Sequence, residues 1–170
     1  MSSKSVFSYR KTATSVSALL FMPLLINPSL AQAGTVPAGQ SQAIDVNTPV
    51  ETWVVETGAT LTGSGASTLG ITGVAGATVN LTNSTVTPDG VNGLTQGIAL
   101  TNASATLNNS TVTSAQGIGI LAARNINSAG GSQVTLGNNS VVRGLVGGLA
   151  GNRFSDLTVQ ESTLEGTGAN

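Results

Sequence analysis

The chain has 170 residues, of which 8% are charged and 3% are aromatic, and it contains no cysteine and no histidine. These absences exclude disulfide frameworks, thiolate zinc sites and every mechanism that depends on a cysteine nucleophile or a histidine base. The formal net charge of −1 and the scarcity of Lys, Glu and Arg disfavour both a nucleic-acid-binding surface and the solvent-exposed faces of a helical bundle.

The first 33 residues are organised like an export signal. Three basic residues precede an apolar run over Ala18–Ile26, and Ala31 and Ala33 form an A-x-A cleavage motif before Gly34. The run is too short to span a membrane, which takes about 20 apolar residues. The pattern therefore predicts a cleavable signal peptide over residues 1–33 and an exported protein, with an unstructured tail as the alternative.

The predicted mature chain begins with residues 34–53, which show no repeat and which we expect to form a lead-in or cap. Cleavage removes three of the six basic residues and none of the seven acidic ones, so the formal charge becomes 3 − 7 = −4. Trp53 and Phe154 are then the only aromatic residues. Because the ends of a repeat array need a cap, Trp53 is predicted to cover the open end of the core, with ligand stacking as the alternative.

Four segments within residues 54–170 align with one another without gaps. They share one leucine-type position, with spacings of 26, 29 and 23 residues, and a weaker copy places Leu61 20 residues before Leu81. The segments are 77–86, 103–112, 132–141 and 155–164. The shared positions, which we expect to stack as a core, are Leu81, Leu107, Leu136 and Val159.

Apolar and polar residues alternate within each segment, as at Val79 and Leu81, and this alternation predicts a strand with one buried face. The next apolar residue follows five positions later, at Val86 after Leu81 and at Val141 after Leu136. In a continuous strand an odd shift would turn that residue outward, so we expect a corner between the two. Asn and Ser suit the corner, because Asn tolerates the left-handed conformation and both bond nearby backbone.

A second short apolar strand precedes the later segments, over 97–100, 117–120 and, less regularly, 144–149. Three short strands in each circuit of about 20–30 residues are typical of a right-handed parallel β-helix, a solenoid whose coils stack on one another. The predicted fold is therefore all-β, with about five coils, and we expect the insert 121–131 to leave the rod as a loop. A β-sandwich and an irregular low-complexity chain are the alternatives.

Asparagine recurs at the predicted corners. We expect Asn83, Asn109 and Asn138 to form a hydrogen-bonded ladder of stacked amides, which Glu161 interrupts. The same asparagines lie in Asn-x-Ser/Thr triplets, which formally match glycosylation acceptors.

The acidic residues are the remaining candidates for catalysis or for metal binding. The closest group is Asp156, Glu161 and Glu165, and we expect Asp156 and Glu165 on opposite sides of a corner. Asp89 lies in a Pro-Asp-Gly turn, where turn chemistry accounts for it. We therefore expect no catalytic residue, no cofactor and no metal.

The mature chain keeps three arginines, which we expect to be solvated surface or loop residues. They are Arg124, Arg143 and Arg153.

These repeats, of the form A-T-L-x-x-S-T-V and G-I-x-L behind a signal peptide, resemble the N-terminal passenger region of pertactin-like autotransporters of the type V secretion system. Residues 76–86 and 130–141 carry the match most clearly, and the resemblance covers residues from about 54 to 170. It implies a β-helical stalk at the bacterial surface with roles in adhesion, host contact and virulence. Polysaccharide lyases and filamentous adhesins share parts of the pattern.

The sequence departs from the family's pattern at its end. It stops at Asn170, just after a repeat, without the outer-membrane β-barrel that a full-length relative carries. The Arg-Gly-Asp tripeptide of some members is absent as well. We therefore expect either a fragment of a longer reading frame or a truncated product, and a truncated product would stay in the periplasm or be secreted rather than reach the cell surface.

The expected function is that of a non-catalytic surface or adhesion module, the stalk of an autotransporter passenger. Its expected partners are a host-cell receptor, a matrix protein or a glycan, and nucleic acid is not among them. Two alternatives remain: a carbohydrate-active β-helix, either lyase-like or glycan-binding, and a truncated remnant without function.

Overall fold

The structure is a computed structural model, and it describes residues 33–90, 95–125, 127–151 and 155–168. The predicted signal peptide through Gln32, including Ala31, lies outside the described residues, and so do Arg153 and Phe154. In the described part of the chain, all elements of regular secondary structure are β-strands. All paired strands run parallel to each other.

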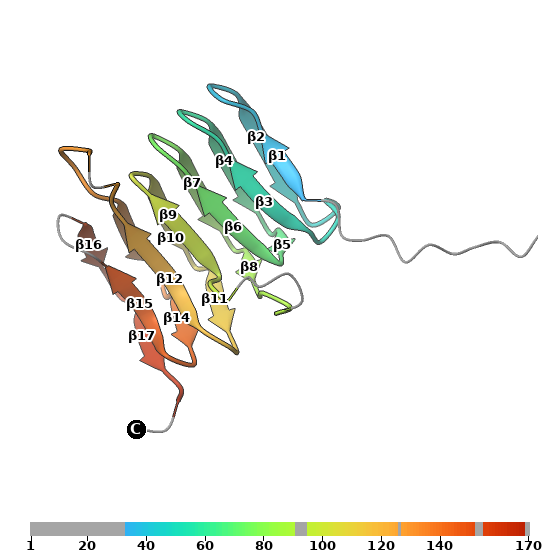
Figure 1. Cartoon of the computed structure of the whole chain (residues 1–170). Helices are drawn as coiled ribbons and strands as arrows, with labels where there is room; N and C mark the ends of the chain where they lie inside the picture. Colours follow the sequence, from blue (N-terminus) through green and yellow to red (C-terminus); the bar gives the residue numbers. More distant parts are fainter. Residues whose placement is uncertain (1–32, 91–94, 126, 152–154, 169–170) are drawn as a thin grey trace, which may run out of the picture.

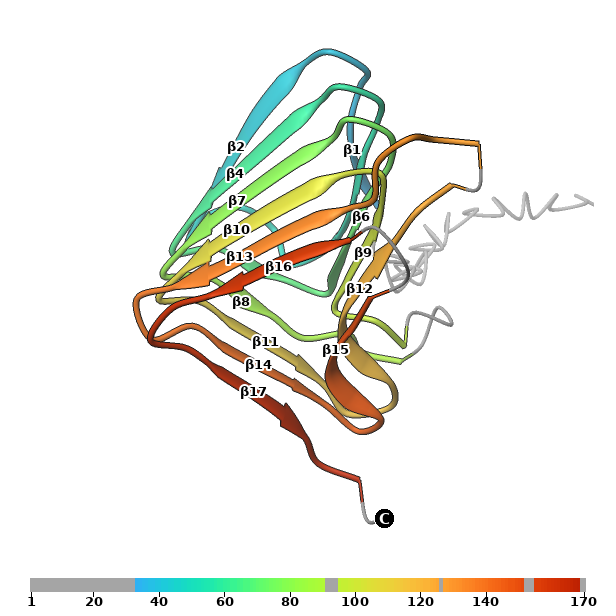
Figure 2. The same cartoon turned by 90° about the vertical axis from the view of Figure 1, so that its left-hand side faces the viewer.

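The strands form three parallel sheets, here named A, B and C, which surround a common interior (Figure 1 and Figure 2). Sheet A consists of β1 (Gly34–Val36), β3 (Thr52–Val55), β6 (Gly70–Gly73), β9 (Ile98–Thr101), β12 (Ile118–Ala123) and β15 (Gly147–Gly151). Sheet B consists of β2 (Ser41–Asp45), β4 (Thr60–Ser64), β7 (Thr78–Thr82), β10 (Ser104–Asn108), β13 (Gln133–Gly137) and β16 (Asp156–Val159). Sheet C consists of β5 (Ser67–Thr68), β8 (Thr85–Val86), β11 (Thr111–Ser114), β14 (Val141–Gly144) and β17 (Thr163–Gly166).

Each circuit of the chain adds one strand to sheets A, B and C in turn, and the next circuit stacks on it. Five complete coils run from β3 to β17, and β1 and β2 form a partial coil before them. Neighbouring strands of a sheet lie about 4.8 Å apart, so the coils stack at that spacing. This arrangement is a parallel β-helix, and it confirms the predicted fold class.

The stack begins earlier than the sequence predicted. Strand β1 pairs with β3, and β2 pairs with β4, so residues 34–53 supply strands of the solenoid instead of a separate lead-in. The alternation in these strands is weak, because Val36 and Ile44 are their only buried residues. The pattern of alternating apolar residues that identifies the later strands therefore does not identify β1 and β2.

The predicted core positions of sheet B lie in register on successive coils. Leu81 pairs with Leu107, and Leu107 pairs with Leu136, and all three side chains are buried. Val159 pairs with Leu136 as expected, but 41% of its surface is exposed. The prediction that Val159 is a core residue is therefore wrong, because β16 is the edge strand of the described sheet and no further strand covers it.

Two predicted alignments are shifted in the structure. Leu61 pairs with Val79, and Gly63 is the partner of Leu81, whose side chain fills the space that a Cβ at Gly63 would need. Farther along the chain, Val142 is the buried partner of Val112, whereas the expected Val141 is only half-buried. The corner before β14 holds one more residue than the gapless alignment allowed.

The predicted insert 121–131 begins three residues later in the structure. Strand β12 continues through Ala123, because Leu121 and Ala122 pair with Ala99 and Leu100 of the coil beneath. The loop therefore begins at Arg124, and it projects from the stack between β12 and β13 (Figure 2).

Candidate functional site

The acidic residues of the last coil do not meet in one cleft. Asp156 lies on sheet B and Glu165 on sheet C, and Glu161 occupies the corner between them, so the structure separates the group as the sequence predicted. Within the described ranges there is no group of three or more His, Cys, Asp or Glu residues that could hold a metal ion. Paired carboxylates of a glycoside-cleaving site need to flank one bond, and these side chains do not.

The ion pair between Arg143 and Glu165 joins the last two coils. Its Nε and Oε2 atoms are 2.6 Å apart, and the two side chains are 42% and 44% exposed. At that exposure, solvent screening limits such a pair to at most about 1 kcal/mol. Arg143 is therefore a surface residue whose side chain is held by Glu165. Arg124 also lies at the surface, in the projecting loop, where its Nε donates a hydrogen bond to the carbonyl of Asn125.

Asp45 closes a tight turn after β2. Its Oδ1 accepts a hydrogen bond from the backbone N–H of Asn47 at 2.9 Å, and that bond lowers the pKa of Asp45, helped by a bond from the Thr48 hydroxyl. Because these bonds favour the carboxylate, they stabilise the turn at neutral pH, and this contribution is lost as the pH falls through the lowered pKa. The turn borders a cavity of about 350 Å³ that is lined by Ala43, Ile44, Asp45, Thr48, Thr62 and Ser64.

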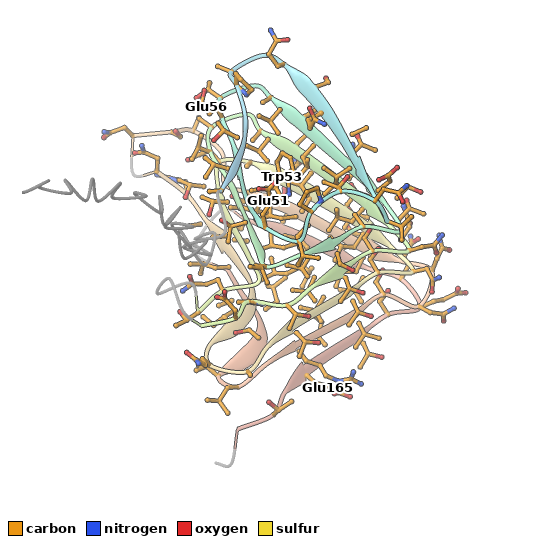
Figure 3. The ribbon with its side chains drawn as sticks, turned by 90° about the vertical axis from the view of Figure 1, so that its right-hand side faces the viewer. Glu51, Trp53, Glu56 and Glu165 are labelled. Atoms are coloured by element: carbon orange, nitrogen blue, oxygen red, sulfur yellow. The ribbon has the colours of Figure 1, made fainter. Side chains whose placement is uncertain are left out.

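Trp53 packs into the interior near the N-terminal end of the stack (Figure 3), and only 7% of its surface is exposed. Gly34 of β1 lies against the ring, since a Cβ there would be 2.7 Å from Trp53 Cε3. The ring therefore closes this end of the core, as the sequence predicted, and its faces are not available for stacking a ligand.

The Asn ladder forms as predicted at its first step and differs at its second. Asn83 and Asn109 adopt left-handed φ angles of 50° and 47°, and Asn109 Nδ2 donates to Asn83 Oδ1 at 2.7 Å. Asn138 is also left-handed, but its Nδ2 donates to Asn108 Oδ1 at 3.1 Å. The extra corner residue is the reason, because Asn138 and Asn139 together occupy the corner that Asn109 spans alone in the coil before.

Inside the same corner runs a serine ladder that the sequence analysis missed. The backbone N–H of Ser84 donates to Ser110 Oγ at 3.1 Å, and that of Ser110 donates to Ser140 Oγ at 3.2 Å. All three serines are at most 3% exposed. The signal was present, because a serine follows the corner residue in all four units once one gap is allowed before Ser140, although the corner residue of the last unit is Glu161 and not an asparagine. Each hydroxyl satisfies a backbone donor that the turn would otherwise bury without a partner.

We expect Asn109→Ala to destabilise the fold by about 1–2 kcal/mol. The substitution removes one side-chain hydrogen bond, and alanine is strained in the left-handed region because its side chain cannot form the compensating hydrogen bonds that asparagine forms. Asn109→Gly loses the same bond but suits the backbone, so it should cost less than Asn109→Ala. Urea unfolding followed by circular dichroism measures both. Equal stability of the two variants would show that the backbone conformation of this corner is not left-handed.

The outer face of sheet B is a regular polar surface that extends over six strands. Its side chains lie in three rows that cross the strands, because the six strands pair in register without a bulge. We call it the polar face, and its central row consists of Ala43, Thr62, Asn80, Thr106, Thr135 and Thr158. The only charges in the three rows are Asp45 on the first strand and Asp156 on the last.

A shallow cavity of about 200 Å³ borders the polar face at the corner between sheets A and B. Asn102 lies in it with a left-handed φ of 54° and holds the projecting loop at both ends. Its Oδ1 accepts from the N–H of Asn125, and its Nδ2 donates to the carbonyl of Gly130. The lining residues are Gly76, Ala77, Asn102, Ala103, Ser104, Gly131 and Gln133.

No protein-family model matches the chain, and no curated protein or solved structure matches it either. A search of the described residues for a helix long and apolar enough to cross a membrane found none.

Proposed function

We propose that the protein is an exported, non-catalytic adhesion module, a β-helical stalk of the kind found in pertactin-like autotransporter passengers, which presents its polar face to a host-cell receptor, a matrix protein or a glycan. The observation that carries the proposal is the polar face itself. Its rows of hydroxyl and amide side chains extend over six strands without a charge between Asp45 and Asp156.

The chemistry of the polar face favours an uncharged, hydrogen-bonding partner. Thr, Ser, Asn and Gln side chains both donate and accept hydrogen bonds, as sugar hydroxyls and exposed peptide groups do. A polyanion needs clustered Lys or Arg, and the outer rows of sheet B contain neither. The spread of the acidic residues over separate strands and corners supports a binding role over a hydrolytic one.

Among these three partners, a glycan is the one that a further specific observation favours. The cavity beside Asn102 combines amide and hydroxyl groups from Asn102, Ser104 and Gln133 with the backbone of Gly76 and Gly131. Its volume of about 200 Å³ is smaller than the 300–1,000 Å³ that is usual for drug-sized ligands, so it suits one sugar unit of a chain that continues along the polar face.

The export step is tested by expressing the full chain in a Gram-negative host and fractionating the cells. The proposal predicts a product outside the cytoplasm whose N-terminus is Gly34, and it predicts that Leu20→Arg, which interrupts the apolar run of the leader, leaves the precursor in the cytoplasm. A wild-type product that keeps its first 33 residues in the cytoplasm would contradict export.

We expect Thr106→Arg to reduce binding of the protein to host cells or to immobilised matrix and glycan panels at least about tenfold, because a large charged side chain interrupts the central row of the polar face. Thr111→Arg is the matched control, since Thr111 is equally half-buried but lies on the outer face of sheet C. Thermal melts of the two variants establish that both are folded. Equal loss of binding in both variants, or none in either, would contradict binding through the polar face.

A further inference from the structure

The predicted cleavage site of the leader adjoins the folded stack directly. Gly34, which follows Ala33 of the A-x-A motif, is the first residue of β1, and it pairs with Trp53 of β3. A Cβ at Gly34 would be 2.7 Å from Trp53 Cε3 and 2.9 Å from Glu51 Oε1, so glycine is the residue that leaves room for both groups. The first residue of the predicted mature chain is therefore packed between an indole ring and a carboxylate.

The carboxylate of Glu51 has no partner of its own. Glu51 is half-buried beside Trp53 (Figure 3), and within the described ranges it forms no side-chain hydrogen bond and no ion pair. The two other acidic side chains at this end are held. Asp45 is bonded within its own turn, and Glu56 Oε2 accepts a hydrogen bond from the backbone N–H of Ala38 at 3.0 Å. Because a partly desolvated carboxylate is costly without a partner, Glu51 is suited to pair with a nearby cation.

The arginines of the mature chain lie farther along the sequence and the stack. Arg124 follows β12 and Arg143 lies on β14, so both belong to the fourth coil, about 14 Å or more along the stack from β3. Arg153, which is outside the described residues, comes later still in the sequence, after β15. The lysines, Lys4 and Lys11, are removed with the leader. The cation that processing itself brings to this end is the new α-ammonium group of Gly34.

We propose that removal of the leader locks the N-terminal end of the solenoid by creating an α-ammonium group at Gly34 that pairs with Glu51. A signal peptidase hydrolyses the bond between Ala33 and Gly34 with one water molecule. The carboxylate leaves with Ala33, and the nitrogen of Gly34, a neutral peptide N–H in the precursor, becomes a protonated amine. Standard covalent geometry places that nitrogen at most about 5.4 Å from Glu51 Oε1. Opposite charges about 4–6 Å apart stabilise each other's ionised forms.

This inference rests on the export and cleavage proposed above, and it adds a consequence for the fold. The precursor has no charge at Gly34, so Glu51 stays unpaired until the leader is removed. In the processed chain the ion pair holds the start of β1 over Trp53 and so closes the end of the core.

The processed product of the full chain, exported from a Gram-negative host, provides the test. Without its leader the chain contains no lysine, so the α-amino group is its only amine and an amine-reactive acylating reagent reports on that group alone. The neighbouring carboxylate should raise the pKa of the α-amino group, and only the neutral amine reacts. We therefore expect Glu51→Gln to be acylated about two- to fivefold faster than the wild type at neutral pH and low salt, as followed by mass spectrometry.

Glu56→Gln is the matched control, because it removes the same charge from the other end of β3 and keeps an oxygen for the N–H of Ala38. It should be acylated at the wild-type rate, and circular dichroism checks that both variants are folded. A second arm needs no variant. Raising the salt concentration to about 1 M screens the ion pair and should speed acylation of the wild type, whereas in concentrated urea all three proteins should react at one rate.

N-terminal sequencing of the purified product separates the two proposals. A product that begins at a residue other than Gly34 would contradict the cleavage site and with it the ion pair. A product that begins at Gly34 but is acylated at the same rate in the wild type and in Glu51→Gln would overturn the ion pair and leave export standing. Equal acceleration by Glu51→Gln and Glu56→Gln, or a wild-type rate that does not depend on salt, would also overturn the ion pair.

Discussion

Leu107→Asp is expected to abolish cooperative folding of the solenoid. Leu107 is fully buried and stacks between Leu81 and Leu136 at the centre of sheet B. The substitution loses a buried side chain worth about 1.5–3 kcal/mol and places a carboxylate where no partner is available, so the total cost should exceed about 4 kcal/mol. Urea unfolding followed by circular dichroism measures the loss.

Thr106→Asp is the control for that experiment. Thr106 neighbours Leu107 on the same strand but faces outward, between Asn80 and Thr135 of the adjacent coils. Its substitution by Asp should change the free energy of unfolding by about 0.5–1 kcal/mol at most. If Thr106→Asp and Leu107→Asp destabilised the protein equally, the assignment of inward and outward faces in β10 would be wrong.

Gly119→Ala is also expected to destabilise the solenoid strongly, although less than Leu107→Asp. Gly119 lies in β12, and a Cβ there would be 2.6 Å from the carbonyl oxygen of Gly148 and 2.8 Å from that of Arg143. Both contacts are with backbone, which cannot move without shifting a neighbouring strand. We expect a cost of about 3 kcal/mol, at the upper end of the usual range for overpacking.

Gly130→Ala is the matched control, because a Cβ at Gly130 in the projecting loop would have no heavy atom within 4 Å other than those of its own and the adjacent residues. We expect its thermal melting temperature to equal that of the wild type. A melting temperature of Gly119→Ala close to the wild-type value would show that sheets A and C are not packed backbone against backbone at this corner.

The strands of the repeated units were predictable because the alternation of apolar and polar residues has a single physical cause, which is burial between the coils above and below. A residue that faces the interior of a stacked coil is covered from above and below, so Leu81, Leu107 and Leu136 have to be apolar, and the residues between them do not. The glycine-flanked strands around Ile98 and Ile120 were predicted from the same cause. The left-handed corner at Asn83 follows from the conformational tolerance of asparagine.

The remaining features depend on what lies next to a residue in space, which the sequence does not state. The corner at Asn138 and Asn139 accepts an added residue while Ser140 keeps its place in the serine ladder, so a gapless alignment put Val141 in the position of Val142. Val159 has the sequence of a core residue and lacks only the strand that would cover it. The polar face also depends on register, because isolated threonines become rows only when the strands align.

Pairs of engineered cysteines test the stacked register most directly, and the chain has no cysteine of its own. Thr106 and Thr135 are register partners on β10 and β13, so their Cα atoms should lie about 4.8 Å apart, within the range that a disulfide bridges. Gln133 is offset from that register by two residues, which places it about 8 Å from Thr106, beyond that range. Under mild oxidation, Thr106→Cys with Thr135→Cys should form an intramolecular disulfide, whereas Thr106→Cys with Gln133→Cys should not. A disulfide in the offset pair and none in the register pair would contradict the coil-on-coil stack on which the polar face depends.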